Sequence, residues 1–383
     1  MKNIIITAHT ANHSFREAEH FDKKECLNKI ISIYPRFKLN RYNIKKNRVK
    51  TLFFVTFIFL LKRILKFPIS NKKFSNFFNY FSKKEISKIY NKDSIVVGLS
   101  GYCLQIIEYA EKKKLITIVD RACPHIETQK KIIFNEIDLL PISNKKHLKE
   151  KIFDNQIVEQ MLKEYDRCNF ISVPSKFTLD SFKNFNLENK IIFNALPPEK
   201  YFKILPINKK NDELVIFSLG FNFIRKGFYY LIEAMRMIED YNIKLILRTT
   251  VPPYLNLKIP KNVQIISNHI KNDELEKIYN SMDVLILPSV DEGFGMVGLE
   301  AMRLKKPIIV TRNVGMKDIL INYMDDAEKF IIEPGDIRAL TNKIIELYDN
   351  KDDLTKYGLN FYNAANIYLK KDVFKAYDKI LRK

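Results

Sequence analysis

The stretch from Val284 to Asp318 reads V-L-I-L-P-S-V-D-E-G-F-G-M-V-G-L-E-A-M-R-L-K-K-P-I-I-V-T-R-N-V-G-M-K-D. It begins with an apolar strand pattern that ends at Pro288, continues through a glycine-containing loop, and enters a helical pattern before a second apolar strand. A strand, a helix and another strand in this order are the repeating unit of an α/β fold. The stretch therefore predicts a parallel sheet covered by helices.

The rest of the second half repeats this alternation. Predicted strands are Leu214–Leu219, Lys244–Arg248, Val263–Ile266, Val284–Pro288 and Pro307–Thr311. Predicted helices are Phe228–Glu239, Asp273–Ser281, Gly298–Leu304, Ile337–Asp349 and a final one over Tyr357–Leu381. Asp273 is the expected N-cap of its helix, with Glu276 completing the box.

The first half shows the same alternation with different residues. Predicted strands are Ile4–Thr7, Ser94–Leu99, Leu115–Asp120 and Phe170–Pro174, with helical patterns that include Leu104–Lys113 and Glu150–Asn169. The proline-containing stretch from Asn194 to Asn211 has the composition of a linker. We therefore predict an α/β protein with two Rossmann-like, doubly wound domains. Because such sheets bind ligands beyond the carboxyl ends of their strands, the active site is expected in the cleft between the domains.

The domain boundaries follow from the linker. Residues 1–205 are predicted to be an N-terminal Rossmann-like domain that includes the basic segment 36–92, residues 206–355 a C-terminal Rossmann-like domain, and residues 356–383 a helix that crosses back to the first domain. The length of 383 residues suits two domains, and 46% hydrophobic with 28% charged residues excludes wholesale disorder. The four cysteines show no metal spacing and are expected to be reduced. The apolar run after Lys2 is interpreted as a first buried strand rather than a signal peptide.

The net charge of +21 is unevenly placed. Up to Leu205 there are 38 Lys and Arg against 20 Asp and Glu, and the segment from Arg36 to Lys92 holds 16 basic residues and one acid, Glu85. Inside it lies the apolar run Thr51–Leu61, which is too short for the ~20 residues of a membrane span. We predict that segment 36–92 faces an anionic membrane surface. A buried core helix with solvated flanks and a nucleic-acid-binding patch are the alternatives, and no nucleic-acid-binding motif accompanies the patch.

Two carboxylates flank the glycines of the opening stretch. Glu292 lies in the loop and Glu300 eight positions later on the helix, so the pair suits two hydroxyl-bearing ends of one ligand. Glycines and a helix start let backbone amides approach phosphate or hydroxyl oxygens. The alternative is an ordinary helix start with solvated glutamates.

A second cluster follows the strand that ends at Gly220, where Arg225 and Lys226 precede a helix. Fixed cations beside helix-start amides suit a diphosphate, although a surface pair of cations is the alternative. A third lies in Asp120-Arg121-Ala122-Cys123-Pro124-His125-Ile126-Glu127.

These motifs together resemble the retaining, family-4-type (group 1) nucleotide-sugar glycosyltransferases with the GT-B fold, of the exopolysaccharide and lipopolysaccharide type. The E-x7-E spacing matches Glu292 and Glu300, and D-R-x-x-x-H-I-E matches the stretch from Asp120. The resemblance implies that Glu292 contacts the donor sugar and Glu300 the ribose. It also implies that His125, Glu292, Arg225 and Lys226 are catalytic. The implied donor-binding residues are Gly220, Arg225, Lys226, Glu292, Gly293, Phe294, Gly295, Met296, Val297 and Glu300.

The acceptor end is less well defined. His9 and His13 follow the first strand, where relatives have a glycine-rich acceptor loop, but the loop has no glycine here. Both histidines are candidates for acceptor binding or for loop packing. His125 is likewise a candidate for sugar contact or for a core histidine.

The function that these features favour is transfer of a hexose or N-acetylhexosamine from a UDP- or GDP-sugar to a lipid-linked or growing glycan, at the inner face of a bacterial plasma membrane. No cofactor and no metal are expected, since the two cations would stabilise the departing diphosphate. A non-catalytic transferase-like scaffold, a nucleic-acid-binding protein and a nucleotide-sugar epimerase are the alternatives. The base, the sugar and the acceptor are not defined by the sequence.

Overall fold

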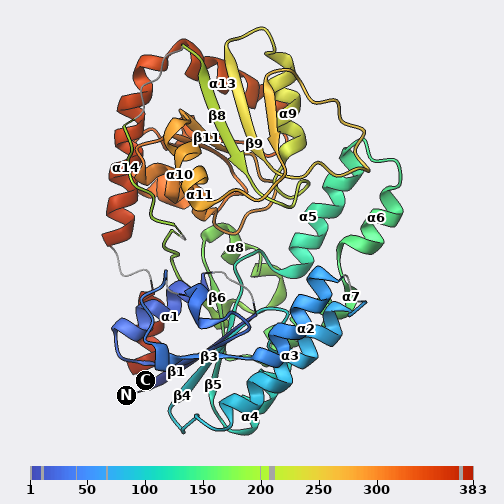
Figure 1. Ribbon diagram of the computed structural model, residues 1–383, viewed down its shortest axis with the longest axis vertical. Coiled ribbons are helices and arrows are strands. Elements are labelled where there is room, and N and C mark those ends of the chain that lie inside the picture. Colours follow the sequence, from blue (N-terminus) through green and yellow to red (C-terminus); the bar gives the residue numbers. More distant parts are fainter. Residues whose placement is uncertain are drawn as a thin grey trace.

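The computed structural model describes residues 2–9, 13–39, 41–65, 68–198, 200–206, 212–370 and 374–382. The polypeptide forms two α/β domains, one above the other in Figure 1, with a linker between them. Each domain is a parallel sheet whose strands alternate with helices, so the predicted fold class is confirmed.

The N-terminal sheet has seven strands in the order β3-β2-β1-β4-β5-β6-β7, all parallel. Its strands are β1 (Asn3–Ala8), β2 (Leu27–Ser32), β3 (Val49–Thr51), β4 (Ser94–Leu99), β5 (Ile116–Asp120), β6 (Phe170–Val173) and β7 (Ile191–Phe193). Its helices are α1 (Ser14–Lys23), α2 (Phe53–Ile64), α3 (Asn71–Ile86), α4 (Leu104–Lys112), α5 (Ile126–Leu139), α6 (Lys145–Ile152), α7 (Asn155–Arg167) and α8 (Lys176–Asp180). The strand order reverses between β1 and β4, which is where ligands bind in such sheets.

The C-terminal sheet has six parallel strands in the order β10-β9-β8-β11-β12-β13. Its strands are β8 (Leu214–Leu219), β9 (Ile243–Arg248), β10 (Val263–Ile266), β11 (Val284–Leu287), β12 (Ile308–Thr311) and β13 (Ile331–Ile332). Its helices are α9 (Phe228–Met237), α10 (Asn272–Ser281), α11 (Met296–Arg303), α12 (Lys317–Tyr323), α13 (Ile337–Asp349) and α14 (Leu354–Lys370). The last helix, α15 (Lys375–Arg382), lies beside the N-terminal domain (Figure 1).

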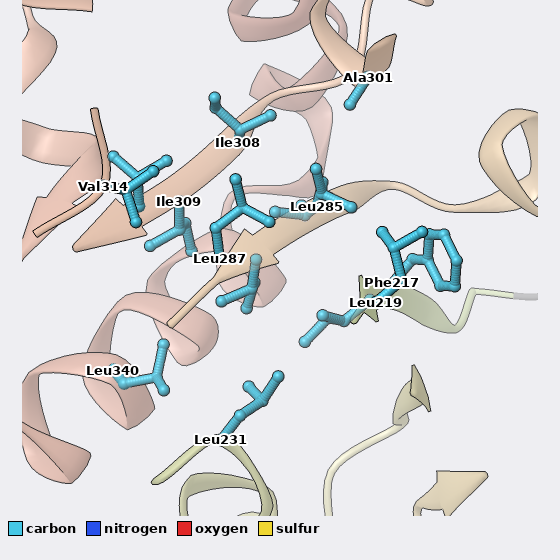
Figure 2. Close-up of a cluster of buried hydrophobic side chains, with 14 of the residues drawn as sticks. Phe217, Leu219, Leu231, Leu285, Leu287, Ala301, Ile308, Ile309, Val314 and Leu340 are labelled. Atoms are coloured by element: carbon cyan, nitrogen blue, oxygen red, sulfur yellow. The ribbon is translucent and has the colours of Figure 1, made fainter. Parts of the chain in front are cut away.

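Apolar side chains of β8, β11 and β12 fill the centre of the C-terminal domain (Figure 2). Phe217, Leu285 and Ile309 are fully buried there, as expected for strands covered on both faces. The same core includes Ile133 and Ile137 of α5, which extends from the N-terminal domain into the C-terminal one. The two domains are therefore joined by α5 as well as by the linker.

The C-terminal helix completes a core of the N-terminal domain. Phe374, Tyr377 and Ile380 are buried in one cluster with Ile4 and Phe21. Because these side chains are nearly fully buried, α15 contributes to the stability of the N-terminal domain.

Several local predictions were wrong. The single predicted helix over Glu150–Asn169 is two helices, because the Asp154 side chain accepts hydrogen bonds from the amides of Gln156 and Ile157 and starts α7. Asp273 is not an N-cap, since α10 begins one residue earlier and its N-cap position is Lys271.

The remaining differences concern short elements. The strands β2, β3, β7 and β13 were not predicted, because three of them are only two or three residues long and β2 is interrupted by the polar residues Asn28 and Lys29. The predicted final helix is divided into α14 and α15. Parts of the predicted linker and basic segment, including Lys66 and Phe67, lie outside the described residues.

Candidate donor site at the carboxyl ends of the strands

The loop after β8 carries the two predicted cations. The side chain of Lys226 lies across Gly220, where an added Cβ would be 2.8 Å from its Cγ. Gly227 has a φ of 64°, and a Cβ there would lie 1.9 Å from the carbonyl oxygen of Pro288, so only glycine fits the start of α9. The amide of Val290 also donates to the carbonyl of Arg225 over 3.0 Å. These contacts fix both cations against the loop that follows β11.

The loop after β11 is held from its other side by residues that follow β12. The amide of Glu292 donates to Asn313 over 2.9 Å, and the amide of Gly315 donates back to Glu292 over 2.9 Å. Gly295, with a φ of 93°, is the N-cap of α11. The Gly293-to-Val297 segment thus leads directly into the N-terminus of α11, whose amides are directed toward the carboxyl ends of the strands.

Three predicted side chains meet between these loops. Lys226 Nζ forms an ion pair with Glu292 Oε2, and Arg225 Nη2 lies 3.6 Å from the same oxygen. Burial raises the pKa of Glu292, but the charges of Lys226 and Arg225 outweigh it, so the pKa lies below its usual value. Burial tends to lower the pKa of Arg225, whereas Glu292 raises it, and the net pKa is raised. Glu292 is therefore ionised between two cations.

Glu300 lies apart from this ion-pair cluster. Its carboxylate accepts hydrogen bonds from the hydroxyl of Tyr279 and the amide of Lys200, both over 3.0 Å. Only 4% of the residue is exposed. Glu300 therefore connects α11 to α10 and to the linker, on the side of the loop away from Arg225.

The N-terminal domain directly contacts the loop between β11 and α11, at Gly293. The hydroxyls of Ser175 and Thr178 donate to the carbonyl of Gly293 over 2.6 and 3.2 Å. A Cβ at Gly293 would lie 1.8 Å from the carbonyl oxygen of Ala122. The glycine is therefore required for the close approach of the two domains.

A buried polar chain crosses the same boundary. Arg121 Nη2 donates to Gln129 Oε1 over 2.9 Å, and Gln129 Nε2 donates to Asp291 Oδ2 over 2.5 Å. Burial raises the pKa of Asp291, although Arg225 and the bond from Gln129 oppose the shift. Arg225 Nη1 also lies 3.9 Å from the sulfur of Cys123. The D-R-A-C-P loop thus packs on the loop that carries the donor-site cations.

His125 is the N-cap of α5, and its ring is surrounded by aromatic side chains. Its Nδ1 accepts a hydrogen bond from the Glu127 amide over 3.3 Å at the start of α5. Its ring stacks on Phe185 at 3.5 Å between centroids and meets Phe182 edge-on. Burial lowers the pKa of His125 to about 4, with a smaller contribution from Arg121. The residue is only 1% exposed. Its ring is therefore held by packing where the β5–α5 loop joins α5.

His9 is caged in the same way after β1. Its ring stacks on Tyr102 at 3.5 Å between centroids and lies 6.4 and 6.0 Å from the rings of Phe74 and Phe78 of α3. Burial lowers the pKa of His9 to about 3. The imidazole is therefore neutral at pH 7. Thr10 to Asn12, the rest of this loop, lie outside the described residues.

His13, Glu17 and Asp120 form a buried cluster at the start of α1. His13 Nε2 pairs with Asp120 Oδ2, and the ligand-type atoms of the three residues lie within 4.8 Å of one another. This spacing would suit a cation as well as a shared-proton network. Burial and the nearby charge of Asp120 raise the pKa of Glu17 well above its usual value, although His13 opposes the shift. A neutral Glu17 beside a His13–Asp120 ion pair is the arrangement consistent with that shift.

The structure thus groups Arg225, Lys226 and Glu292 with the glycines of the two loops, and places His9, His13 and His125 in separate environments. Gln129, Ser175 and Thr178 were not identified from the sequence as site residues. Ser175 could be predicted as an N-cap, because it follows a strand and begins α8. Nothing in the local sequence indicates that its hydroxyl also reaches the opposite domain.

The second half of the chain is similar to a known protein family. Residues 200–364 match the family model of the glycosyl transferases group 1. The capsular polysaccharide biosynthesis glycosyltransferase CapM of Staphylococcus aureus is 30% identical over 233 residues, which cover 58% of this chain and 55% of CapM. The chain spans about half the length of the curated relatives that it matches.

Solved structures agree over the whole chain. TarM superposes with a TM-score of 0.67 at 12% identity, covering 100% of this chain and 99% of TarM. HepE of Anabaena, in complex with UDP and glucose, superposes with a TM-score of 0.64 at 12% identity and the same coverage. At these identities the superpositions establish the fold alone. Residues 200–364 are therefore similar to the group 1 glycosyl transferases, and they lie within a two-domain fold of the GT-B type.

Proposed function

We propose that this protein is a retaining glycosyltransferase that moves a hexose or N-acetylhexosamine from a UDP- or GDP-sugar to a lipid-linked or growing glycan of the cell surface. The observation that carries the proposal is the convergence of Lys226, Arg225 and Glu292 at the ends of β8 and β11. The group 1 domain includes all three residues, and the relative CapM acts in capsular polysaccharide biosynthesis.

In the proposed mechanism, Arg225 and Lys226 bind the diphosphate of the donor. Two fixed cations stabilise the negative charge that develops when the bond between the sugar and the phosphate breaks. The N-terminus of α11 adds a partial positive charge at the same edge of the sheet. This chemistry needs no metal ion.

Glu292 is proposed to hold the sugar hydroxyls rather than to attack the anomeric carbon. An ionised carboxylate engaged by two cations is a weak nucleophile but a good hydrogen-bond acceptor. Asp291, the adjacent carboxyl, is buried and bonded to Gln129. We therefore propose a front-face displacement in which a leaving-phosphate oxygen takes the proton of the acceptor hydroxyl, so that the anomeric configuration is retained.

Glu300 and His125 are assigned supporting parts. Glu300 is proposed to accept from the ribose hydroxyls when the donor displaces its bond with the Lys200 amide. His125 is proposed to hold the β5–α5 loop, and through it Ala122, against Gly293. This close packing of loop on loop would exclude water from the donor and limit its hydrolysis.

The test is donor turnover by the purified protein with a panel of UDP- and GDP-sugars. We expect release of one nucleoside diphosphate, a retained anomeric configuration in the freed sugar by proton NMR, and a loss of about 100-fold or more in Lys226→Met. Lys244→Met, which removes a cation from β9 in the same domain, should behave like the wild type. An epimerase would convert the sugar without releasing nucleotide, and a scaffold would do neither; either result would refute the proposal.

A further inference from the structure

Apart from Thr56 and the two cations of its last turn, Lys62 and Arg63, the helix α2 consists of apolar residues. Val55 and Ile58 are buried in the core of the N-terminal domain, and Phe59 packs partly against it. The positions on the opposite side of the helix are equally apolar, although a surface helix normally presents polar residues there. The inner half of α2 therefore packs on the core, whereas the outer half is exposed, apart from a contact at 5.3 Å between the rings of Phe54 and Phe81.

The outer half forms a continuous exposed surface. Phe53 is 74% exposed, Phe57 57% and Ile64 69%. Leu60 is also exposed, and it falls on the same helical face because residues three and four apart are neighbours on a helix. Large side chains gathered in this way on the surface mark an interaction site rather than a random scatter of apolar residues.

The neighbouring helix α3 extends this surface. The two helices pack side by side on the outside of the N-terminal domain (Figure 1). On α3 the exposed face carries Phe77 and Tyr80, with Lys73 and Lys84 at its two ends. We call the exposed apolar side chains of α2 and α3 the outer face; they are Phe53, Phe54, Phe57, Leu60, Ile64, Phe77 and Tyr80.

The exposed charges that α2 and α3 place beside the outer face are positive. Arg63, Lys73 and Lys84 are exposed beside it, and the segment from Arg36 to Lys92 contains a single acid, Glu85. That acid is already paired with Lys50 over 3.3 Å and with Lys88 over 2.8 Å. An apolar surface bordered by cations is complementary to the interfacial region of an anionic bilayer, where aromatic rings enter and cations meet phosphates.

Aromatic contacts connect the inner side of α2 to the end of β1. The helix α2 follows β3, and in a parallel sheet the carboxyl ends of all strands lie at one edge. The ring of Phe59 is 5.8 Å from that of Phe74, which in turn is 6.4 Å from His9. These ring contacts connect α2, through Phe74 of α3, to His9 at the end of β1.

We propose that the outer face docks on an anionic lipid bilayer, with α2 lying in the plane of the interface. The 12 residues of α2 are shorter than the ~20 that a span requires. Among the described residues, no helix has both the length and the apolar character needed to cross a membrane. The docking itself does not depend on the proposed sugar transfer.

The test measures binding of the full chain to vesicles of phosphatidylcholine, with and without about one third phosphatidylglycerol. We expect binding only to the anionic vesicles, and weaker binding in about 0.5 M salt because the charges are screened. Phe53→Ser/Phe57→Ser/Ile64→Ser should weaken binding at least about tenfold. Arg63→Glu/Lys73→Glu/Lys84→Glu should weaken it by about a hundredfold.

Two control variants make the same chemical changes in the C-terminal domain. Ile321→Ser/Leu359→Ser/Ile367→Ser removes exposed apolar side chains there, and Lys258→Glu/Lys277→Glu/Lys356→Glu reverses exposed charges. Both should bind as the wild type does. All substituted side chains are exposed, so we expect unchanged melting temperatures.

Three results would overturn the proposal. The first is vesicle binding that neither outer-face variant weakens. The second is a protein that does not bind vesicles but forms a dimer, which the apolar variant dissociates. The third is a protein that does not bind vesicles but binds DNA in a salt-sensitive way. Donor turnover, measured on the same preparations, should stay within twofold in the outer-face variants. Loss of turnover in the wild type with intact vesicle binding would refute the proposed function and leave the docking in place.

Discussion

The two domains share one architecture but build their inner edges from different chemistry. In the C-terminal domain, glycines at sharp turns bring Arg225, Lys226 and Glu292 into one ion-pair cluster. In the N-terminal domain, the corresponding edge holds His9 and His125 in aromatic cages that keep them neutral. The C-terminal edge thus carries a charged cluster, whereas the imidazole rings of His9 and His125 are buried and neutral. The contrast suggests that donor chemistry resides in one domain and positioning in the other.

The largest effect is expected from the charged side of this comparison. Glu292→Gln should reduce kcat/KM for donor turnover about 1000-fold, or about 4 kcal/mol. The substitution removes a charged hydrogen-bond acceptor and leaves Lys226 and Arg225 without their anionic partner. Glu328→Gln, which weakens an exposed ion pair with Arg312 in the same domain, is the control. Activity within threefold of wild type in Glu292→Gln would argue against a role for the cluster in catalysis.

The rigidity of the C-terminal loops can be tested by a pair of glycine variants. Gly227→Ala should lower the free energy of unfolding by about 3 kcal/mol, since it combines a left-handed backbone with a Cβ 1.9 Å from the Pro288 carbonyl. Gly335→Ala has a similar φ of 80°, but its nearest neighbours are side-chain atoms of Tyr230 at 3.4 Å or more. It should cost only about 1 kcal/mol. Equal losses in urea denaturation of the two variants would show that the packing of the loops adds nothing.

The caged histidines predict a pH dependence of stability. The folded pKa of His125, about 4, lies below the unfolded value near 6.5. Between these values the unfolded chain binds more protons, so stability falls as the pH is lowered from 6.5, by about 1.4 kcal/mol per pH unit for a fully caged ring. His125→Asn keeps an N-cap acceptor for Glu127 and removes the titration. Its melting temperature should therefore depend less on pH than that of the wild type. If the melting temperature of His125→Asn falls with pH below 6.5 as steeply as that of the wild type, the pKa of His125 is not lowered in the folded state.

The smallest effect is expected at the boundary between the domains. Gln129→Ala removes the donor to buried Asp291 and the acceptor for Arg121. The loss should be about 1–2 kcal/mol in unfolding, accompanied by a small rise in KM for the donor. Gln105→Ala, at an exposed hydrogen bond to Asn76, should be neutral. If Gln129→Ala and Gln105→Ala have the same free energy of unfolding, the hydrogen bonds of Gln129 do not contribute to the contact between the domains.

The sequence was most informative where a backbone constraint accompanied the chemistry. Around Glu292, two glycines between a strand and a helix predicted the turn, whereas the ion pairs of Glu292 with Lys226 and Arg225 were not predicted. The alternation of strands and helices likewise predicted both sheets. The short strands β3 and β13 were not predictable, since two or three residues carry no periodicity and depend on their neighbours in the sheet.

The N-terminal domain was harder to interpret for a physical reason. The environment of His125 is set by Phe182 and Phe185, which lie more than fifty residues later. Gln129 and Ser175 contact the opposite domain across more than one hundred residues of sequence. Such contacts arise from tertiary packing and leave no local pattern in a single sequence.

The proposed function requires that a nucleotide-sugar bind beside the cluster of Arg225, Lys226 and Glu292. The most direct measurement is the melting temperature of the wild type and of Glu300→Gln with UDP, GDP, UDP-glucose, UDP-N-acetylglucosamine and GDP-mannose. A nucleotide at a hundred times its Kd should add about 2.7 kcal/mol to the stability of the folded state. We predict stabilisation by the nucleotides of one base, reduced in Glu300→Gln. Absence of a shift with every nucleotide would contradict the assignment of this site to a nucleotide-sugar donor.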